Sequence, residues 1–295
     1  MLNIDSLVRG VQDLVTLPDS YLRLREACDD PDNGPFEIGA IIRNDPAFSA
    51  RLLRMANSPY FGFVSEIDSV PRAVQALGIK LIEMLALADA ARVAFDPAQI
   101  PGIDLQAYWQ RSTWAGSMAR RLALHTGGMP PETAFVCGLL HDTGHLVMAI
   151  RAPEALGFAS SESERLSVPL EIVETRHYGF DYADVGAELL KEWQLPASII
   201  EPVAFHSKLD AYPEDGEFRR LATALYAAAV LARSEDRDSA VSMDISESIC
   251  RELGTDAEGL GEMLPAVDND AAEISALMAP GSGNSRPTPT VRASA

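Results

Sequence analysis

Basic residues and cysteines are scarce in this sequence, and each shortage excludes a class of protein. The 295 residues include 24 Lys and Arg against 43 Asp and Glu, a formal net charge of −19. Nucleic acid duplexes and anionic membranes attract clustered Lys and Arg, so we expect neither to be a direct partner. Cys28, Cys137 and Cys250 form no C-x-x-C pair, which argues against a redox motif, a zinc ribbon and a disulfide framework. A reducing, cytoplasmic location fits this composition.

Long apolar runs are missing too. The first residues, MLNID, lack the basic and apolar regions of a signal peptide. The most apolar stretch, 221–232, is about a dozen residues long, short of the roughly 18 needed to span a bilayer. We therefore predict no transmembrane segment and a buried helix at 221–232.

The sequence also lacks the common catalytic signatures of strand-to-helix turns. It contains no G-x-S-x-G, no G-x-x-x-x-G-K-[ST] and no G-x-G-x-x-G. Those motifs expose a nucleophilic serine or wrap backbone N–H groups around phosphates. Neither a serine hydrolase nor a phosphate-loop enzyme is indicated.

Apolar residues recur at spacings of three and four almost throughout, which predicts an all-α protein. Asp45 before Pro46 and Asp104 before an apolar periodic stretch are typical helix starts. A densely apolar core helix is expected at 79–95, and the breaks at 96–102 mark a subdomain boundary. Further helices are predicted at 131–140, 143–150, 169–176, 182–193, 197–205 and 218–233. A helix or two between 245 and 278 would fit, and the small polar residues of about the last 15 positions predict disorder.

The pair His141-Asp142 is the main candidate for chemistry. It ends an apolar helix just before Gly144, so an imidazole and a carboxylate can face one point. This is ligand chemistry for a divalent transition metal, and the alternative is that both side chains cap helices by hydrogen bonding. His145, four residues after His141, is expected on the surface or in a capping role.

The remaining candidates are less specific. His206 ends another apolar helix and can point inward or toward solvent, whereas His125 and His177 lie near glycine-containing loops and are expected to be exposed. Asn57, Tyr60 and Phe61, at a helix exit, form either a recognition surface or a loop packed onto its own core.

Several motifs, in order, make the chain resemble the HDOD family, a non-catalytic relative of the HD-type metal-dependent phosphohydrolases. The resemblance covers about residues 14–233. In the first half it rests on IIRNDP (41–46), LLRMANS (52–58) and SVPRAVQALG (69–78). In the second half it rests on Tyr108-Trp109, FVCGLLHDTG (135–144), GAELL (186–190), WQLP (193–196) and His206.

The resemblance implies a bundle of two packed helical subdomains with a degenerate metal site. The expected boundaries are an HDOD-specific part at 1–100, a degenerate HD-like part at 101–235 and an acidic extension at 236–295, disordered from about 280. His141, Asp142 and His206 remain at ligand positions. Arg111, Tyr182 and Ala229 stand where catalytic relatives have further ligands. No metal and no cofactor is therefore expected.

Arg111 is the decisive replacement, because a guanidinium is permanently charged and repels a divalent ion. We predict that Arg111 forms an ion pair with Asp142 and so replaces the metal by a contact between two helices.

The function that the resemblance implies is that of a bacterial, non-enzymatic signal-transduction protein acting through protein contacts, in cyclic-di-GMP or two-component pathways. Two alternatives stay open. One is a pseudoenzyme that binds a nucleotide in the vestigial cleft, with Arg111 on a phosphate, which requires Arg111 to be solvent-accessible in a pocket. The other is a residual phosphohydrolase with a rearranged metal site at His141, Asp142 and His206.

Overall fold

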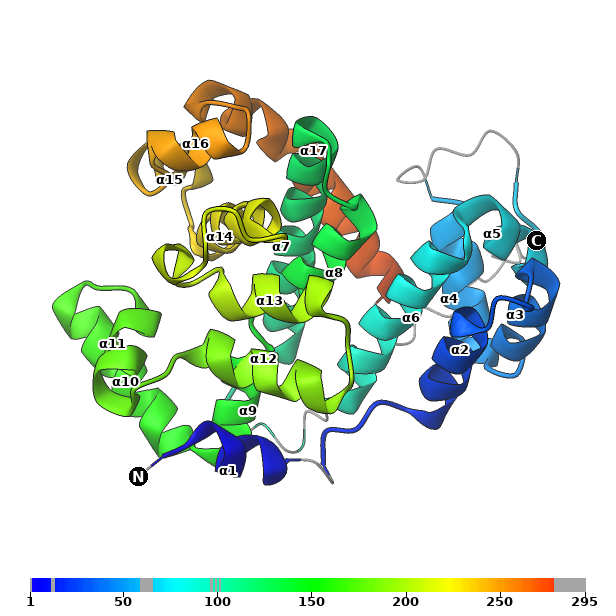
Figure 1. Cartoon of the computed structure of the whole chain (residues 1–295), viewed down its shortest axis with the longest axis horizontal. Helices are drawn as coiled ribbons and strands as arrows, with labels where there is room; N and C mark the ends of the chain where they lie inside the picture. Colours follow the sequence, from blue (N-terminus) through cyan, green and yellow to red (C-terminus); the bar gives the residue numbers. More distant parts are fainter. Residues whose placement is uncertain are drawn as a thin grey trace, which may run out of the picture.

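The computed structural model describes residues 2–11, 14–58, 66–95, 98, 100 and 102–278, and over these residues the chain consists of helices joined by turns, with no β-strand (Figure 1). The predicted all-α fold is confirmed. One apolar core runs through the molecule, from Leu7 and Val8 near the start to Ile274 and Met278 near the end of the described chain.

The first part of the chain forms a group of short helices at one side of the molecule (Figure 1). Asp45 caps its helix as expected, since its Oδ1 accepts a hydrogen bond of 2.9 Å from the backbone N–H of Phe48. The predicted core helix at 79–95 is present, and ten of its sixteen residues are buried. The helices are α2 (Asp19–Asp29), α3 (Pro35–Ile42), α4 (Pro46–Ala56), α5 (Val70–Leu77) and α6 (Ile79–Ala94).

The second part is built around a long central helix, α7 (Leu105–Thr126), which Asp104 caps as predicted. It packs against α8 (Pro131–Leu140), α14 (Arg219–Arg233) and α17 (Ala257–Met278). Two glycines allow α7 and α8 to approach closely: a Cβ on Gly138 would lie 2.5 Å from the Cα of Gly116. Residues 221–232 lie within α14 and are almost all buried, as predicted.

Further helices surround this centre. They are α9 (Thr143–Arg151), α10 (Pro153–Leu166), α11 (Leu170–Tyr178), α12 (Tyr182–Glu192), α13 (Ala197–Phe205), the 3-10 turn η2 (Leu209–Ala211), α15 (Arg237–Met243) and α16 (Glu247–Glu252). The observed ends fall within two residues of the predicted ones for each helix that the periodicity indicated. Helix α10 was not predicted, because it buries only Ala159 and therefore shows little apolar periodicity.

Both ends of the described chain pack across the predicted subdomains. Helix α1 (Ile4–Arg9) contacts α9 and α12, and α17 contacts both α7 and α4. Side chains add to this: Arg25 donates a hydrogen bond of 2.9 Å to the carbonyl of Trp193, and the Trp193 indole donates to the carbonyl of Val15. The boundaries at 100 and 235 stay predictions, and the disorder predicted from about 280 concerns residues outside the described part.

One segment, Pro131–Arg151 across α8 and α9, is long and apolar enough by length and composition to cross a membrane. However, 78% of its most apolar window is buried inside the protein, as expected for core helices.

Candidate functional site

Five helix ends meet at the position expected for a metal in the HD relatives. His141 follows the last residue of α8 and Asp142 precedes α9, while Tyr182 begins α12, His206 follows α13 and Arg233 ends α14. The rings of His141 and His206 lie 5.4 Å apart, almost perpendicular to each other. The structure thus brings together His141, Asp142, Tyr182 and His206, and His206 points inward.

Both histidines of this pair are held by local hydrogen bonds. The Nδ1 of His141 donates to the carbonyl of Gly138 at 2.7 Å, and the Nδ1 of His206 donates to the carbonyl of Val203 at 2.8 Å. A carbonyl can only accept, so each proton lies on Nδ1. Burial lowers the pKa of His141 and lowers that of His206 strongly. Both imidazoles are therefore neutral near pH 7.

Tyr182 forms a hydrogen bond with the ring nitrogen that His206 would offer to a metal. Its hydroxyl donates to Nε2 of His206 at 2.8 Å and accepts a hydrogen bond from Arg233 at 3.0 Å. Both ring nitrogens of His206 are thereby engaged. A chain of hydrogen bonds therefore runs from Arg233 through Tyr182 to His206.

Arg233 supplies the positive charge at this position. Besides Tyr182, its guanidinium donates to the carbonyl of Ala229 at 3.2 Å and pairs with Glu171 at 3.3 Å. The side chain is 38% exposed, so the guanidinium reaches the buried tyrosine from the rim of the site. Ala229 contributes only its backbone, because its side chain is fully buried and apolar.

A second charged group lies beside the first. His145 is held between Asp142, at 2.5 Å from Nδ1, and the completely buried Glu174, at 3.1 Å from Nε2, and its ring stacks on Tyr182 at 4.1 Å. Burial by itself would lower the pKa of His145, but Asp142 and Glu174 outweigh it and raise the pKa to about 10. In the same way His145 and His141 keep the pKa of Asp142 below its usual range despite burial. His145 is thus a largely buried cation held between two carboxylates, where a surface or capping role was predicted.

The predicted ion pair between Arg111 and Asp142 is wrong. Arg111 is exposed on α7, and among the described residues no ion pair joins it to Asp142. The physical reason is local: Asp142 finds its cation three residues along its own helix, in His145. The neighbouring Ser112 is the residue that α7 turns inward.

Glu174 and Arg233 belong to this site but were not among the residues predicted for it. Glu174 binds His145 with one oxygen and accepts the backbone N–H of Tyr182 at 2.9 Å with the other. The only available signal was the spacing of Arg233, which lies one helical turn after Ala229 and so on the same face of α14.

These residues do not fit a divalent metal. His206 has no free ring nitrogen, because it donates to Val203 and accepts from Tyr182, and His145 engages one of the two oxygens of Asp142. Arg233 adds a fixed positive charge. Within the described part of the chain, no group of three or more His, Cys, Asp or Glu could hold a metal ion.

The side chain of Asn57 is bonded within the chain and is not free to contact a partner. Its side-chain nitrogen donates to the carbonyls of Leu53 and Ile67, both at 2.8 Å, and its oxygen accepts the N–H of Ile67 at 2.7 Å. Asn57 therefore ties the end of α4 to the chain before α5. Tyr60 and Phe61 lie outside the described residues, so the interface predicted there stays a prediction.

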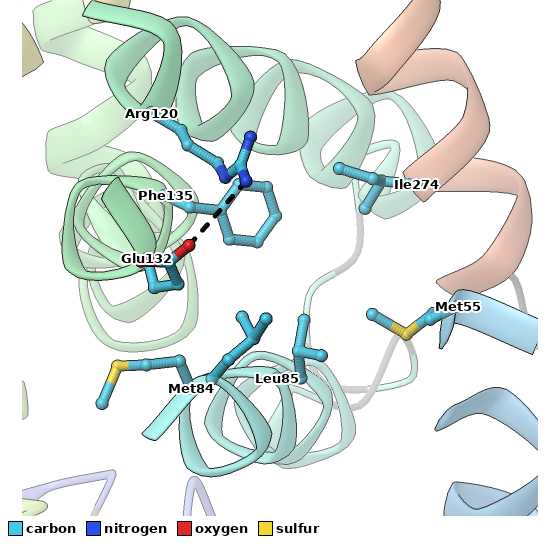
Figure 2. A pocket seen from close by; sticks show the side chains of 8 residues that line it. Met55, Met84, Leu85, Arg120, Glu132, Phe135 and Ile274 are labelled. Carbon is cyan, nitrogen blue, oxygen red and sulfur yellow. Dashed lines mark ion pairs between the residues drawn. The ribbon is translucent and has the colours of Figure 1, made fainter. Parts of the chain in front are cut away.

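A small apolar pocket lies elsewhere, between α4, α6, α7, α8 and α17. Figure 2 shows Met55, Met84 and Leu85 facing Phe135 across it, with Arg120 and Glu132 paired at 3.8 Å on its rim. The hollow is no wider than a water molecule needs, and its lining is apolar apart from Arg120 and Glu132, which pair with each other. We assign no chemistry to it.

Comparison with known proteins identifies the family. A family model described as the HDOD domain matches residues 14–209. The chain belongs to the HDOD family. A Treponema pallidum protein, described only as uncharacterized, is 28% identical over 212 residues, which are 71% of this chain but 40% of that protein. The chain thus spans about 40% of the length of this relative.

Solved structures share the fold of this HDOD chain. A protein from Shewanella amazonensis SB2B, provisionally named a phosphohydrolase, superimposes with a TM-score of 0.74 at 25% identity, covering 93% of this chain and 98% of that one. An HDOD domain protein of unknown function from Geobacter sulfurreducens gives a TM-score of 0.73 at 23% identity, covering 92% and 97%.

Proposed function

We propose that this HDOD chain is a non-enzymatic regulatory protein that acts through contacts with other proteins. The observation that supports this is the chain of hydrogen bonds from Arg233 through Tyr182 to His206, at the position where the resemblance to HD enzymes puts the metal. A hydrolytic metal site needs several protein ligands and an open position for water. Here the retained histidine and carboxylate are bonded to neighbours instead.

The charge balance of the site supports the same conclusion. Arg233 and the protonated His145 supply two positive charges, which face Asp142, Glu171 and Glu174. In a metal enzyme such carboxylates would face the ion. In this chain side-chain cations meet them.

The metal content of the purified protein tests the proposal. The chain is purified without chelator under anaerobic conditions, and iron, manganese, zinc, nickel and cobalt are measured by elemental analysis. We expect less than about a tenth of an equivalent in total. One or two equivalents that disappear in His141→Ala or Asp142→Ala, but persist in the matched control His125→Ala, would overturn the proposal.

Hydrolysis assays test the proposal independently of the metal content. With each metal added in excess, we expect no hydrolysis of cyclic dinucleotides or of a generic phosphodiester above that of the His141→Ala variant. Hydrolysis that depends on His141 would make the chain a phosphohydrolase, the activity to which the provisional name of the Shewanella relative points.

One observation favours a second candidate function, nucleotide binding without turnover. Arg111 is exposed, and no ion pair engages it among the described residues, so it meets the accessibility that a phosphate contact requires. Calorimetric titration with mono- and dinucleotides tests this. Binding that is lost in Arg111→Ala and kept in Arg176→Ala, another exposed arginine, would support nucleotide binding. If no nucleotide produced a heat of binding, this candidate function would be ruled out.

A further inference from the structure

The hairpin of α10 and α11 stands at the edge of the molecule (Figure 1). Helix α10 packs mainly against α9 and α11, and its single buried residue is Ala159. The inner side is fixed by hydrogen bonds, from the Tyr178 hydroxyl to the carbonyl of Ala155 at 2.9 Å and from the Ser163 hydroxyl to the carbonyl of Val168 at 2.6 Å. The opposite side is largely exposed, although the ring of Phe158 packs edge-on against His177 of α11, with 5.0 Å between the ring centres.

This outer side carries an ordered stripe of residues. Glu154, Phe158, Ser161 and Arg165 are all exposed and follow one another at spacings of four, three and four. With 3.6 residues per turn, that spacing aligns them along one face of the helix, as in the seam of a two-helix contact. Phe158 keeps 50% of its surface exposed at the centre of the stripe.

The stripe is complementary to the same stripe of a second copy that runs antiparallel to it. The midpoint between Glu154 and Arg165 is also the midpoint between Phe158 and Ser161, and it falls between Ala159 and Ser160. A twofold axis there places Glu154 opposite Arg165 of the partner subunit, and Phe158 opposite Ser161 of the partner subunit. We propose that α10 is a dimer contact in which two copies of this chain pair their α10 helices antiparallel across that axis.

Gly157 supports a close approach at this face. A Cβ on Gly157 would meet nothing within 4 Å, so the fold of the single chain does not require glycine there. Glycine inside a helix nevertheless costs about 1 kcal/mol relative to alanine. Beside Ser160 and Ser161 it leaves a shallow depression, which receives the Phe158 ring of the second copy.

Arg165 stays accessible although it is paired within its own helix. Its guanidinium makes two hydrogen bonds to Glu162, at 2.8 and 2.5 Å, yet 65% of the side chain stays exposed. In the antiparallel pairing Glu162 faces Gly157 of the partner subunit, so no like charges oppose each other along the stripe.

The predicted dimer is weak. Each α10 has 14 residues and is about 21 Å long, and one pair of such helices buries less than the roughly 1,200 Å² of a stable interface. We therefore expect association in the micromolar to millimolar range.

Sedimentation equilibrium of the full chain across that concentration range is the first test. We expect a reversible monomer–dimer equilibrium, and Phe158→Glu should raise the dissociation constant by about tenfold or more, because it puts two carboxylates at the centre of the contact. The matched control is Phe36→Glu, an exposed phenylalanine on α3, which should leave the equilibrium unchanged.

A charge exchange makes the test independent of any effect on folding. Glu154→Arg alone and Arg165→Glu alone each set like charges against each other in a homodimer, so both should be more weakly associated than the unaltered chain. An equimolar mixture of the two variants forms complementary heterodimers, with both pairs restored. Association in the mixture that exceeds either variant alone is the expected result.

Three outcomes overturn the proposal: a chain that stays monomeric at millimolar concentration, a dimer that Phe158→Glu leaves unchanged, and variants that do not associate better when mixed. Thermal unfolding of each variant at low concentration verifies that the monomer is folded.

Discussion

Tyr182 shows how a single side chain can join several groups of a site. Its hydroxyl is at once a donor to His206 and an acceptor from Arg233, and its ring stacks on His145. Histidine at this place would offer a ring nitrogen to a metal, whereas a phenol with a pKa raised by burial keeps its proton and gives it to a neighbour. The hydroxyl of Tyr182 therefore engages the second ring nitrogen of His206.

Removing only the hydroxyl of Tyr182 tests this arrangement. Tyr182→Phe leaves Nε2 of His206 without its donor and Arg233 without one acceptor, in a buried setting, so we expect the free energy of unfolding to fall by about 1–3 kcal/mol in urea denaturation. The control Tyr226→Phe changes a half-buried tyrosine on α14 and should cost less than about 0.5 kcal/mol. Equal losses in the two variants would show that the hydroxyl of Tyr182 contributes nothing special.

His145 makes stability depend on pH on the alkaline side. Its pKa is about 10 in the folded chain and about 6.5 in the unfolded one. The folded state thus holds a proton that the unfolded state releases, so this contribution is complete below about pH 6.5 and is lost as the pH rises toward 10. The charged groups that face His145 are Asp142 and Glu174, with Arg233 and the neutral His141 beyond them.

Urea denaturation between about pH 6.5 and pH 9.5 measures this effect. We expect the unfolding free energy of the unaltered chain to fall by on the order of 2 kcal/mol more than that of His145→Gln, which has no proton to lose. His145→Gln should itself be less stable by about 3–5 kcal/mol near neutral pH, because it leaves two carboxylates without their cation. Parallel pH curves for the two chains would contradict the assignment of a charged His145.

At the scale of helices, Gly144 allows α9 and α12 to cross at a short distance because it has no side chain. A Cβ on Gly144 would lie 1.8 Å from the carbonyl oxygen of Tyr182 and 2.7 Å from the nitrogen of Gly186. These are backbone atoms, so the helices themselves would have to separate, and Tyr182 would move away from His145 and His206.

Gly144→Ala should therefore destabilise the chain by more than about 3 kcal/mol or prevent folding. The matched variant Gly261→Ala lies inside α17, where a Cβ would meet nothing within 4 Å, and it should stabilise the chain by about 0.5–1 kcal/mol. Thermal unfolding of both variants compares them directly. A tolerated Gly144→Ala would mean that α9 and α12 have room to separate.

Helix positions were predictable where local signals were strong, and contacts between distant helices were not. Asp45 and Asp104 cap as expected because an N-cap depends only on the next three residues. Arg111 was placed correctly along α7, but which way it faces depends on neighbours far along the chain. Likewise the contact of Arg233 with Tyr182 joins residues 51 positions apart, and no spacing rule predicts it.

Across the whole molecule, α17 acts as part of the core and not as an appendage. It runs along α7 and reaches α4, so one helix from the end of the described chain packs on both of the expected subdomains. Trp114 donates from its indole to Asp268 at 2.7 Å, and Arg121 pairs with Asp270 at 2.6 Å. The acidic composition that made this region look like a solvated extension therefore supplies carboxylates to the central helix.

Shortening the chain tests that conclusion. A chain that ends at Asp256 lacks six buried apolar residues of α17, namely Leu260, Leu264, Val267, Ala271, Ile274 and Met278. A buried Leu, Val, Ile or Met contributes about 1.5–3 kcal/mol, so the sum rivals the 5–15 kcal/mol that typically stabilises a domain. We expect this chain to lose the near-ultraviolet circular dichroism of its tryptophans and its cooperative unfolding. A chain that ends at Met278 keeps every one of these contacts and should unfold at the same temperature as the full chain. If the chain ending at Asp256 did so as well, α17 would be an accessory helix, and the first 256 residues would fold without it.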